Sequence, residues 1–510
     1  MKVLSSWMTT VLNIALCSAA LLIVLDYSIA NVCIPYIAGD LAVSVEEGIY
    51  VITSFAVGNA VVLPMSDWLA KRLGLVRCLV GSILLFALFS FLCGFSFSIE
   101  MLVVCRFFQG LVSGPLLPLS QSLLIEVNPP EQKNKVLAFF STVVLVGPIL
   151  GPVLGGWIAF DYSWPWIFYI NIPIGLLGAS IIWALLKGKV STLEKKSLDW
   201  LGFFLLLACV ATLQVILDKG EQFDWFRSPI IQTLGCICVV SFTFFVAWEL
   251  KHPRPFVDLR LLKIGSFLTS LISFLFFYGL YFGSIVLVPL WLKEGMGYTI
   301  PWAGLAVAPF GVFPLIFSVF MGKVVSRYGS LRPMILGVIC FVLSSFYPIQ
   351  FDTNIDFFHV ALSRFFFGIG VTLFVTPAFA LSLQDIPTPR LPSATGLFHF
   401  VRAMVGGFGT STFTTLWARR TIYHHEVLGE HTNTFSPQTH EMLTDLGKFG
   451  LKDQEGLAAL NVIVDQQASM LALNDCFYLM AWIFIALIPV LSGFYIYHRR
   501  AKRASVLVKN

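Results

Sequence analysis

Long apolar segments recur along the whole chain, and they limit what it can fold into. Each is about 20 residues long, which as a helix rising 1.5 Å per residue crosses a hydrocarbon layer about 30 Å thick. Backbone N–H and C=O groups inside a bilayer must pair within the segment, so these segments are predicted to be helices. Charged residues make up only 12% of the chain. The sequence therefore predicts an all-α, polytopic membrane protein with fourteen transmembrane helices, at residues 11–34, 48–69, 77–97, 101–125, 136–158, 166–186, 198–217, 229–249, 266–292, 302–324, 332–350, 357–382, 392–417 and 473–497.

The distribution of Lys and Arg between the connections indicates the orientation, because basic residues favour the cytoplasmic side of a membrane. Most of the 33 Lys and Arg residues lie on the side that holds both termini, and three lie inside predicted spans. The other side holds only Lys219, Arg227, Lys293, Arg419, Arg420, Lys448 and Lys452. Both termini are therefore expected in the cytoplasm. The net charge of +5 follows from this topology and does not indicate nucleic-acid binding.

An internal repeat divides the chain. The basic turn Asp67-Trp-Leu-Ala-Lys-Arg72-Leu-Gly74-Leu-Val-Arg77 recurs in the second half as Gly322-Lys-Val-Val-Ser-Arg327-Tyr-Gly329-Ser-Leu-Arg332. Further along, Arg106-Phe-Phe-Gln-Gly110 recurs as Arg364-Phe-Phe-Phe-Gly368. Parallel repeats of this kind are typical of transporters. We expect a six-helix bundle at 1–190, two inserted transmembrane helices at 191–263, and a second six-helix bundle at 264–510 that includes an extracytoplasmic loop at 418–472.

Ionisable residues inside the predicted spans are the clearest functional signal, because a charge in the hydrocarbon costs a few kcal/mol. Asp26 and Arg106 lie about 13 and about 8 Å from the outer boundary, so their side chains can pair. A guanidinium favours the ionised carboxylate and apolar surroundings favour the protonated one, so the pair can load and release a proton. The alternative is a static ion pair that locks two helices. Arg364 and Arg402 could contact an anionic substrate or only backbone carbonyls.

These motifs resemble those of the major facilitator superfamily, and in particular its fourteen-span drug:proton antiporters of the EmrB-like group. The resemblance covers nearly the whole chain. It is carried by Leu25-Asp26-Tyr-Ser-Ile-Ala-Asn31-Val-Cys-Ile-Pro35, Trp68-Leu-Ala-Lys-Arg72-Leu-Gly74, Arg106-Phe-Phe-Gln109-Gly110, Pro118-Leu-Ser120-Gln121-Ser122, Gly147-Pro148-Ile-Leu-Gly151-Pro152-Val-Leu-Gly155-Gly156 and Trp166-Ile-Phe-Tyr-Ile-Asn171-Ile-Pro173. One departure is Lys71, which stands where the superfamily usually has an acid. Asp67, one helical turn earlier, is the candidate to pair with the basic neighbours.

The resemblance implies a proton-driven exporter of hydrophobic toxic compounds that works by alternating access, with Asp26 and Arg106 as the proton-coupling residues. In the fifth span, the small residues Gly147, Gly151 and Gly155 form a stripe on one face. The stripe, with Pro148, Pro152 and Gly156, is expected to form an interface between the bundles, and the alternative is ordinary tight packing. The cytoplasmic-turn motif consists of Asp67, Arg72, Gly74 and Arg77. The candidates for the substrate cavity are Asn31, Gln109, Gln121 and Arg402.

Protons are the expected coupling ion, and no cofactor, metal or catalytic residue is expected. His424, His425, His431 and His440 match no structural metal site. The expected partners are hydrophobic small molecules and the lipid bilayer. The resemblance to inner-membrane pumps of tripartite systems adds a periplasmic membrane-fusion adaptor (EmrA-like) and an outer-membrane channel (TolC-like). It also implies a location in the bacterial inner membrane.

The segment 418–472 is the one long hydrophilic stretch of the chain. Ser436-Pro437 predicts a helix start with a capping hydroxyl. A second amphipathic helix is predicted from Leu457, Leu460, Val464 and Leu471. These helices fit either a membrane-parallel lid or a docking surface for an adaptor.

Two other functions stay open at this point. The same fold could export a lipid, a siderophore or a metabolite. A multi-spanning membrane enzyme would need a catalytic His–acid pair or a metal cluster at the membrane surface, and the sequence has no P-loop, HExxH or GxSxG motif. We therefore do not expect an enzyme.

Overall fold

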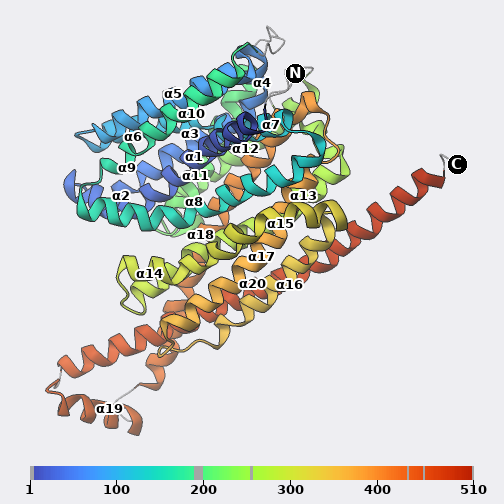
Figure 1. The fold of residues 1–510 in the computed structure, drawn as a ribbon. Coiled ribbons are helices and arrows are strands. Elements are labelled where there is room, and N and C mark those ends of the chain that lie inside the picture. Colours follow the sequence, from blue (N-terminus) through green and yellow to red (C-terminus); the bar gives the residue numbers. More distant parts are fainter. Residues whose placement is uncertain (1–4, 189–198, 253–256, 433–435, 452–453, 508–510) are drawn as a thin grey trace.

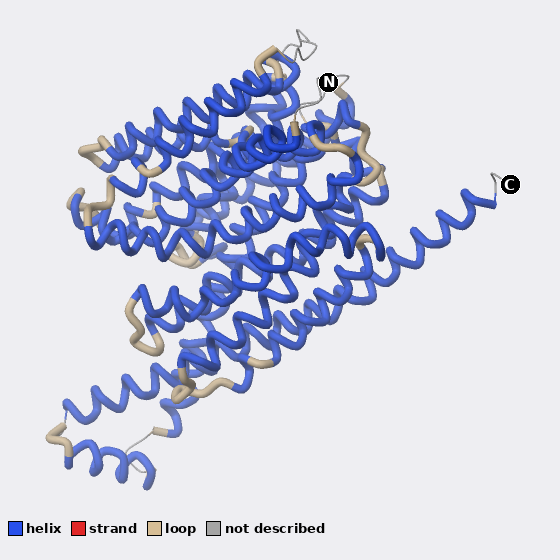
Figure 2. The backbone as a smooth tube through the Cα atoms, in the orientation of Figure 1, coloured by secondary structure: helices blue, strands red, loops and turns tan. Residues whose placement is uncertain are grey.

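Every regular element in the described part of the chain is a helix (Figure 2). The computed structural model describes residues 5–188, 199–252, 257–432, 436–451 and 454–507. Helices lie at all fourteen positions predicted from hydropathy. Ten helices in the described residues are long and apolar enough to cross a membrane, or up to eleven if a bent pair counts as one span. The all-α, polytopic fold class is therefore confirmed.

The first bundle is built from the helices between the N-terminus and residue 186. They are α1 (Ser6–Asp40), α2 (Val45–Gly48), α3 (Tyr50–Val62), α4 (Ser66–Leu73), α5 (Leu75–Gly94), α6 (Ile99–Ser113), α7 (Leu116–Val127), α8 (Lys133–Asp161), α9 (Trp166–Tyr169) and α10 (Asn171–Leu186). Within this bundle, α1 packs against α8 and α10, and α3 packs against α6.

The second half of the chain begins with two helices, α11 (Trp200–Lys219) and α12 (Pro229–Lys251), which we call the inserted hairpin. The second bundle follows with α13 (Gly265–Glu294), α14 (Ile300–Val307), α15 (Val312–Tyr328), α16 (Leu331–Phe346), α17 (Phe357–Leu383), α18 (Leu391–His431), α19 (Pro437–Lys448) and α20 (Gln454–Leu507). In Figure 1 the two bundles lie one above the other, and α8 and α15 run side by side between them.

Four predicted spans are split into two helices each. The span 166–186 divides at Ile170 into α9 and α10, and at each of the other three breaks stands a proline. Pro64 lies in the 3-10 turn between α3 and α4, Pro115 lies between α6 and α7, and Pro309 lies in the 3-10 turn between α14 and α15. Proline has no backbone N–H and its ring clashes with the preceding turn, so it interrupts a helix. Hydropathy predicted the positions of the spans but not the breaks within them.

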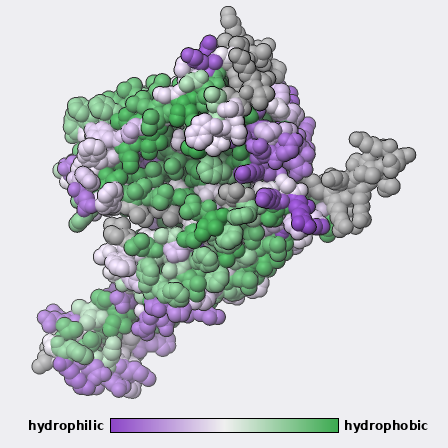
Figure 3. Space-filling model, viewed as in Figure 1, coloured by the Kyte–Doolittle hydropathy of each residue, from purple (hydrophilic) through white to green (hydrophobic). Residues whose placement is uncertain are grey.

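The chain begins and ends at the same end of the bundles, which we call the termini face (right in Figure 1). The opposite face carries α19 and the neighbouring parts of α18 and α20. Apolar side chains cover the visible sides of both bundles (Figure 3). Hydrophilic side chains gather near the termini face and around α19, as expected for a protein whose middle band contacts lipid.

The internal repeat is visible in the packing. Gly74 ends α4 with φ +89° and Gly329 ends α15 with φ +77°, a backbone conformation that only glycine adopts without strain. A Cβ added at Gly110 would meet the carbonyl oxygen of Phe55, and one added at Gly368 would meet that of Phe310. Both bundles therefore use a glycine for the same close helix contact.

The predicted loop 418–472 is mostly helical in the structure. Its described residues form the end of α18, all of α19 and the start of α20, which we call the projection. The helix start at Pro437 is confirmed, but the Ser436 hydroxyl donates to Gln438 Oε1 at 2.9 Å and does not cap the helix. The predicted second helix is present as the first turns of α20. The projection extends away from the bundles (Figure 1) and does not lie across them as a lid.

Candidate functional site

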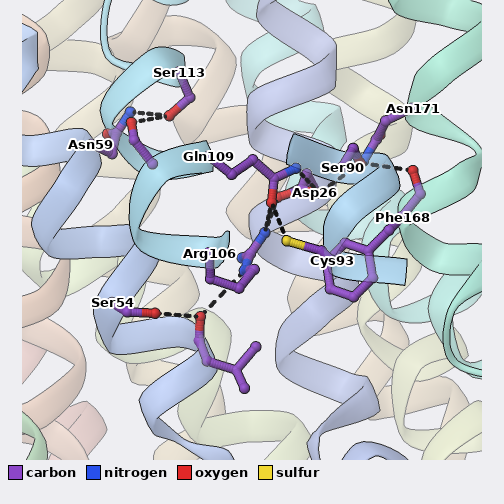
Figure 4. A network of polar contacts seen from close by, with 12 residues as sticks. Asp26, Ser54, Asn59, Ser90, Cys93, Arg106, Gln109, Ser113, Phe168 and Asn171 are labelled. Carbon is purple, nitrogen blue, oxygen red and sulfur yellow. Dashed lines mark hydrogen bonds and ion pairs between the residues drawn. The ribbon is translucent and has the colours of Figure 1, made fainter. Parts of the chain in front are cut away.

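Asp26 lies at the centre of a buried polar network on the first bundle (Figure 4). Its Oδ2 accepts a hydrogen bond from Arg106 Nη1 at 2.5 Å, which is also an ion pair. Its Oδ1 accepts from Asn171 Nδ2 at 2.8 Å and from Gln109 Nε2 at 3.3 Å. Asp26 is 2% exposed and Arg106 is fully buried. We call these four residues the acid site.

The Arg106 guanidinium has partners on three sides. Its Nη1 also donates to Gln109 Oε1 at 2.8 Å, and its Nε donates to the carbonyl of Val51 at 3.2 Å. The guanidinium lies 4.2 Å from the ring centroid of Phe55 and 5.4 Å from that of Phe168. Such contacts stabilise a cation in an apolar environment. The charge is thus held by one carboxylate, two carbonyl-type oxygens and two aromatic faces.

Four helices bring these groups together. Asp26 is in the middle of α1, Arg106 and Gln109 are one turn apart on α6, and Asn171 begins α10. Ser90 on α5 supports Asn171 by accepting a hydrogen bond from its Nδ2 at 3.1 Å. The predicted pairing of Asp26 with Arg106 is present in the structure, whereas sequence reasoning assigned no role to Asn171. Asn171 lies within the motif Trp166–Pro173, and this position was the one sequence feature that could have indicated a role for it.

The second bundle holds a related arrangement. Arg364 on α17, the counterpart of Arg106 in the repeat, donates from Nη1 to the Ser284 hydroxyl of α13 at 2.8 Å. Its guanidinium lies 5.2 Å from the ring centroids of both Phe367 and Phe477. In the described residues Arg364 forms no ion pair. The predicted contact of Arg364 with backbone carbonyls is therefore not present in the described residues, where the guanidinium binds serine hydroxyls instead.

Two of the four residues predicted to line the substrate cavity, Gln109 and Gln121, are buried in contacts between helices. Gln109 is fully buried and belongs to the acid site, so its assignment to the cavity is corrected. Gln121 on α7 is 1% exposed, and its Oε1 bonds to Nε2 of His399 on α18 at 2.7 Å, so it joins the two bundles. Hydropathy cannot tell which face of a buried helix a polar residue occupies. His399 was missed altogether, although it is the only imidazole within the span 392–417.

The other two cavity candidates keep their assignment as predictions. Asn31 is exposed on α1. Arg402 on α18 is half-buried and donates from Nη1 to the Tyr278 hydroxyl at 2.8 Å, with its guanidinium 5.4 Å from the same ring. Its Nε is buried without a hydrogen-bond partner.

Hydrogen bonds join the bundles near the termini face. The Ser122 hydroxyl of α7 lies 3.0 Å from that of Thr395 on α18, and the Ser141 hydroxyl of α8 lies 2.8 Å from that of Thr376 on α17. Asn134, at the start of α8, donates to Ser326 of α15 at 2.9 Å. The termini face is therefore closed by direct contacts between the bundles.

The glycine stripe of α8 does not lie between the bundles. A Cβ at Gly147 would lie 2.7 Å from Val24 Cγ1, one at Gly151 would overlap Ser28, and one at Gly155 would lie 3.1 Å from the Ile29 carbonyl. All three contacts are with α1 of the same bundle, and Ser28 also donates to the Pro148 carbonyl at 2.9 Å. Gly156 has no atom within 4 Å of an added Cβ, and the side chain of Pro152 lies outside the described residues. The expected inter-bundle interface is corrected to tight packing within the first bundle.

The cytoplasmic-turn motif caps α4. Asp67 pairs with Lys71 at 2.6 Å, so the acid one turn earlier does reach a basic neighbour. Arg72 lies with its guanidinium 5.2 Å from the Trp68 ring, and Gly74 provides the positive φ that ends the helix. Arg77 is exposed on α5.

Three of the four histidines in the projection contact an acid or the backbone, and the backbone contact is that of His431 Nδ1, 2.8 Å from the Val427 carbonyl. His424 Nε2 lies 2.7 Å from Asp475 Oδ2, which also accepts from Arg420 Nε at 2.6 Å. His425 Nδ1 lies 2.7 Å from Asp465 Oδ1. No group of three or more metal-ligating side chains occurs in the described residues.

Comparisons with known proteins show the family to which the chain belongs. The Major Facilitator Superfamily model matches residues 16–410. The chain is 39% identical over 491 residues to the multidrug export protein EmrB of Escherichia coli (strain K12), covering 96% of this chain and 95% of that protein. It is 37% identical over 489 residues to the fatty acid resistance protein FarB of Neisseria gonorrhoeae, covering 95% of each.

Solved structures of other proteins share the fold of this chain. The human organic anion transporter MFSD10 (TETRAN) superposes with a TM-score of 0.57 over 94% of this chain and 98% of that chain, at 12% identity. At this identity the match describes the arrangement of helices only. Family model, relatives and fold together show a multi-pass bacterial membrane protein, and the chain belongs to the major facilitator superfamily, among the relatives of EmrB.

Proposed function

We propose that the protein is a proton-driven exporter of hydrophobic toxic compounds, which exchanges protons for substrate by alternating access. The observation that carries this proposal is the buried Asp26–Arg106 pair, a charge pair held in the hydrophobic depth of the first bundle. Intramembrane acids mark proton or ion pathways by default, because an idle charge at that depth is costly. The relationship to the EmrB multidrug export protein supports hydrophobic drugs as the substrate class.

The acid site can couple a proton to a change of conformation. In the present arrangement Asp26 accepts three hydrogen bonds, one of them from the Arg106 guanidinium. If α1 and α6 move apart, Asp26 loses the guanidinium and the apolar surroundings favour the protonated acid. Return of Arg106 would then expel the proton. The ion pair is thus a switch with two protonation states.

The decisive experiment uses purified full-length protein in proteoliposomes with an imposed pH gradient and ethidium as the probe. We expect wild-type protein to move ethidium uphill and to move protons when ethidium is added. Asp26→Asn should abolish both while the protein still inserts and folds. The control is Asp40→Asn on the same helix, an exposed acid that accepts from Trp164 Nε1 at 2.7 Å outside the acid site. Uphill transport by Asp26→Asn would reject the proposal.

We further propose a place for the protein in the cell. The distribution of Lys and Arg supports both termini in the cytoplasm and, for a bacterial protein, the inner membrane. The projection would then reach into the periplasm, where it offers a docking surface for an EmrA-like adaptor and, through it, a TolC-like channel. Co-purification of the adaptor with wild-type protein, and its loss when residues 432–453 are replaced by a short Gly-Ser linker, tests this assignment.

A second substrate class is favoured by a specific observation. The cations Arg364 and Arg402 lie within the second bundle, and neither forms an ion pair in the described residues. An anionic amphiphile such as a fatty acid could neutralise them, and FarB carries the name of a fatty acid resistance protein. Proton movement triggered by a long-chain fatty acid, and lost in Arg402→Gln but kept with ethidium, would assign this second class.

A further inference from the structure

A second intramembrane carboxylate lies on the inserted hairpin, outside the acid site. Asp218 occupies the last turn of α11 and is half-buried. Its Oδ2 accepts a short hydrogen bond from the Thr53 hydroxyl of α3, and its Oδ1 accepts from Gln214 Nε2 at 3.1 Å. Both donors are neutral. In the described residues no Lys or Arg nitrogen pairs with Asp218.

The charged and titratable groups around Asp218 are engaged elsewhere. Lys219, the next residue, directs its ammonium to the Tyr50 ring of α3, with Nζ 4.9 Å from the centroid. On α18, Arg419 lies 3.8 Å from Glu221 in the connection after α11, and Arg402 donates to Tyr278. Glu249 and Lys251 of α12 lie at the other end of the hairpin. The remaining neighbour is Tyr27 of α1, which is within electrostatic range of both Asp218 and Arg106.

The two acids flank the same turn of α3. The Val51 carbonyl accepts from Arg106 of the acid site, and Thr53, two residues along, binds Asp218. Asp26 already accepts three hydrogen bonds, one of them from the Arg106 guanidinium. Asp218 has no cation within hydrogen-bond distance in the described residues: both of its donors are neutral, and Lys219, the next residue, acts on it only through its electrostatic field. A proton that arrives while the termini face is closed therefore meets at Asp218 a carboxylate that no guanidinium or ammonium group binds directly in the described residues.

Thr53 is suited to both protonation states of Asp218. Its hydroxyl also lies 3.3 Å from the Ile49 carbonyl, so it has a second acceptor. When Asp218 is ionised, the hydroxyl donates to the carboxylate. When Asp218 is protonated, the new O–H can donate to the Thr53 oxygen while Thr53 donates to Ile49. No hydrogen bond is then lost on proton uptake.

The position of Asp218 links it to both bundles. The α11 helix packs against α3 of the first bundle and α18 of the second. One residue before Asp218, the Leu217 carbonyl accepts from the Ser411 hydroxyl of α18 at 2.7 Å. A rocking motion of the bundles must change one of these two attachments. The surroundings of the carboxylate therefore depend on the conformation, as a coupling site requires.

We propose that Asp218 is a second proton-binding residue of the transport cycle, which takes up a proton from the face opposite the termini while Asp26 remains paired with Arg106. The inference rests on the proton-coupled export proposed above. In each cycle a proton from the aqueous phase on that face adds to the carboxylate of Asp218, and the same proton leaves to the termini side after the bundles have reoriented.

The test is the number of protons exchanged per substrate. In proteoliposomes with the membrane potential clamped, the logarithm of the steady-state accumulation ratio of a probe rises with the pH gradient, and the slope gives that number. Ethidium serves as a cationic probe and Nile red as a neutral one. We expect Asp218→Asn to lower the slope by about one proton for both probes and to retain uphill transport, whereas Asp26→Asn loses it. The matched control is Asp224→Asn on the same hairpin, an exposed acid paired with Arg227, which should keep the wild-type slope.

Each outcome decides the proposal. A wild-type slope for Asp218→Asn overturns it, and so does a loss of ethidium transport alone with an unchanged slope for Nile red, which would make Asp218 a cation-binding residue. If Asp218→Asn does not fold, Thr53→Val replaces it. Removing this donor should move the pH midpoint of substrate-triggered proton release upward, and an unchanged midpoint contradicts the proposal. Absence of any slope in the wild-type protein would instead reject proton-coupled export itself.

Discussion

The two bundles place an arginine in the same position and give it different partners. Arg106 donates from Nη1 to Asp26 at 2.5 Å, and Arg364 donates from Nη1 to Ser284 at 2.8 Å. In both cases the partner lies 80 residues earlier in the chain, on the first helix of its bundle. Both guanidinium groups face aromatic rings, and both leave Nη2 buried without a hydrogen bond.

This comparison separates what the repeat supplies from what one bundle adds. The repeat supplies the helix contacts, the turn glycines and the buried arginine. Of these two arginines, only Arg106 pairs with a carboxylate in the described residues, and the serine hydroxyl that Arg364 binds does not ionise at physiological pH. Proton chemistry is therefore expected in the first bundle, while the second bundle offers a cation whose charge is not neutralised by an acid in the described residues.

The largest effect is expected when the first site is made like the second. Asp26→Ser removes the only carboxylate of the acid site, so substrate-driven proton movement and uphill efflux should both be lost. The reverse change, Ser284→Asp, should leave proton-driven transport in place because Asp26 is intact. Ethidium transport in proteoliposomes measures both. Uphill transport by Asp26→Ser would show that the difference between the bundles is not the source of coupling.

The arginines themselves should differ in their effect on stability. Arg106→Met leaves Asp26 as a buried charge without its counter-ion, which typically costs about 3–5 kcal/mol. Arg364→Met removes a cation that has no acid partner in the described residues, and the loss of its charge-assisted bond to Ser284 should cost about 1.5–3 kcal/mol. Thermal unfolding of the two variants in the same detergent compares them. Equal destabilisation would mean that the carboxylate contributes little beyond the scaffold.

The fold and the Asp26–Arg106 pair could be predicted because each depends on features that can be read within single segments of the sequence. Apolar segments of membrane length predict helices, and a pair of charges inside two of them predicts contact at matching depth. Proline breaks at Pro64, Pro115 and Pro309 changed helix boundaries but not the number of predicted positions.

The rest of the site depends on which face of a helix each residue occupies. Gln109 and Gln121 look alike in the sequence, yet one binds Asp26 and the other binds His399 across the bundles. The glycine stripe of α8 likewise could have faced either bundle. Asp218 lies one residue beyond the predicted span 198–217, so a boundary shift of a single residue concealed it.

The scaffold contacts shared by the bundles should respond alike. Gly110→Ala and Gly368→Ala each force a Cβ against a backbone carbonyl, and overpacking of this kind typically costs about 1–3 kcal/mol. Gly156→Ala, where no atom lies within 4 Å of the added Cβ, is the control and should be neutral or slightly stabilising. The measurement is again thermal unfolding in detergent. A cost confined to one bundle would mean that the repeat is preserved in sequence but not in packing.

The smallest effect is expected where the two bundles meet near the termini face. Thr395→Val removes a hydroxyl that lies 3.0 Å from Ser122 and 3.2 Å from the Pro118 carbonyl, both across the interface. A neutral hydrogen bond contributes about 1 kcal/mol, so the open state at this face should become several-fold more populated. Hydrogen–deuterium exchange in the first turns of α18 and in α7 should increase accordingly. Thr414→Val on the same helix is the matched control, because its hydroxyl bonds only to the Thr410 and Ser411 carbonyls of α18. If both variants exchange alike, the contact fixes helix geometry and does not hold the two bundles together, and the closure at this face must then depend on apolar packing such as that of Phe140 against Phe379.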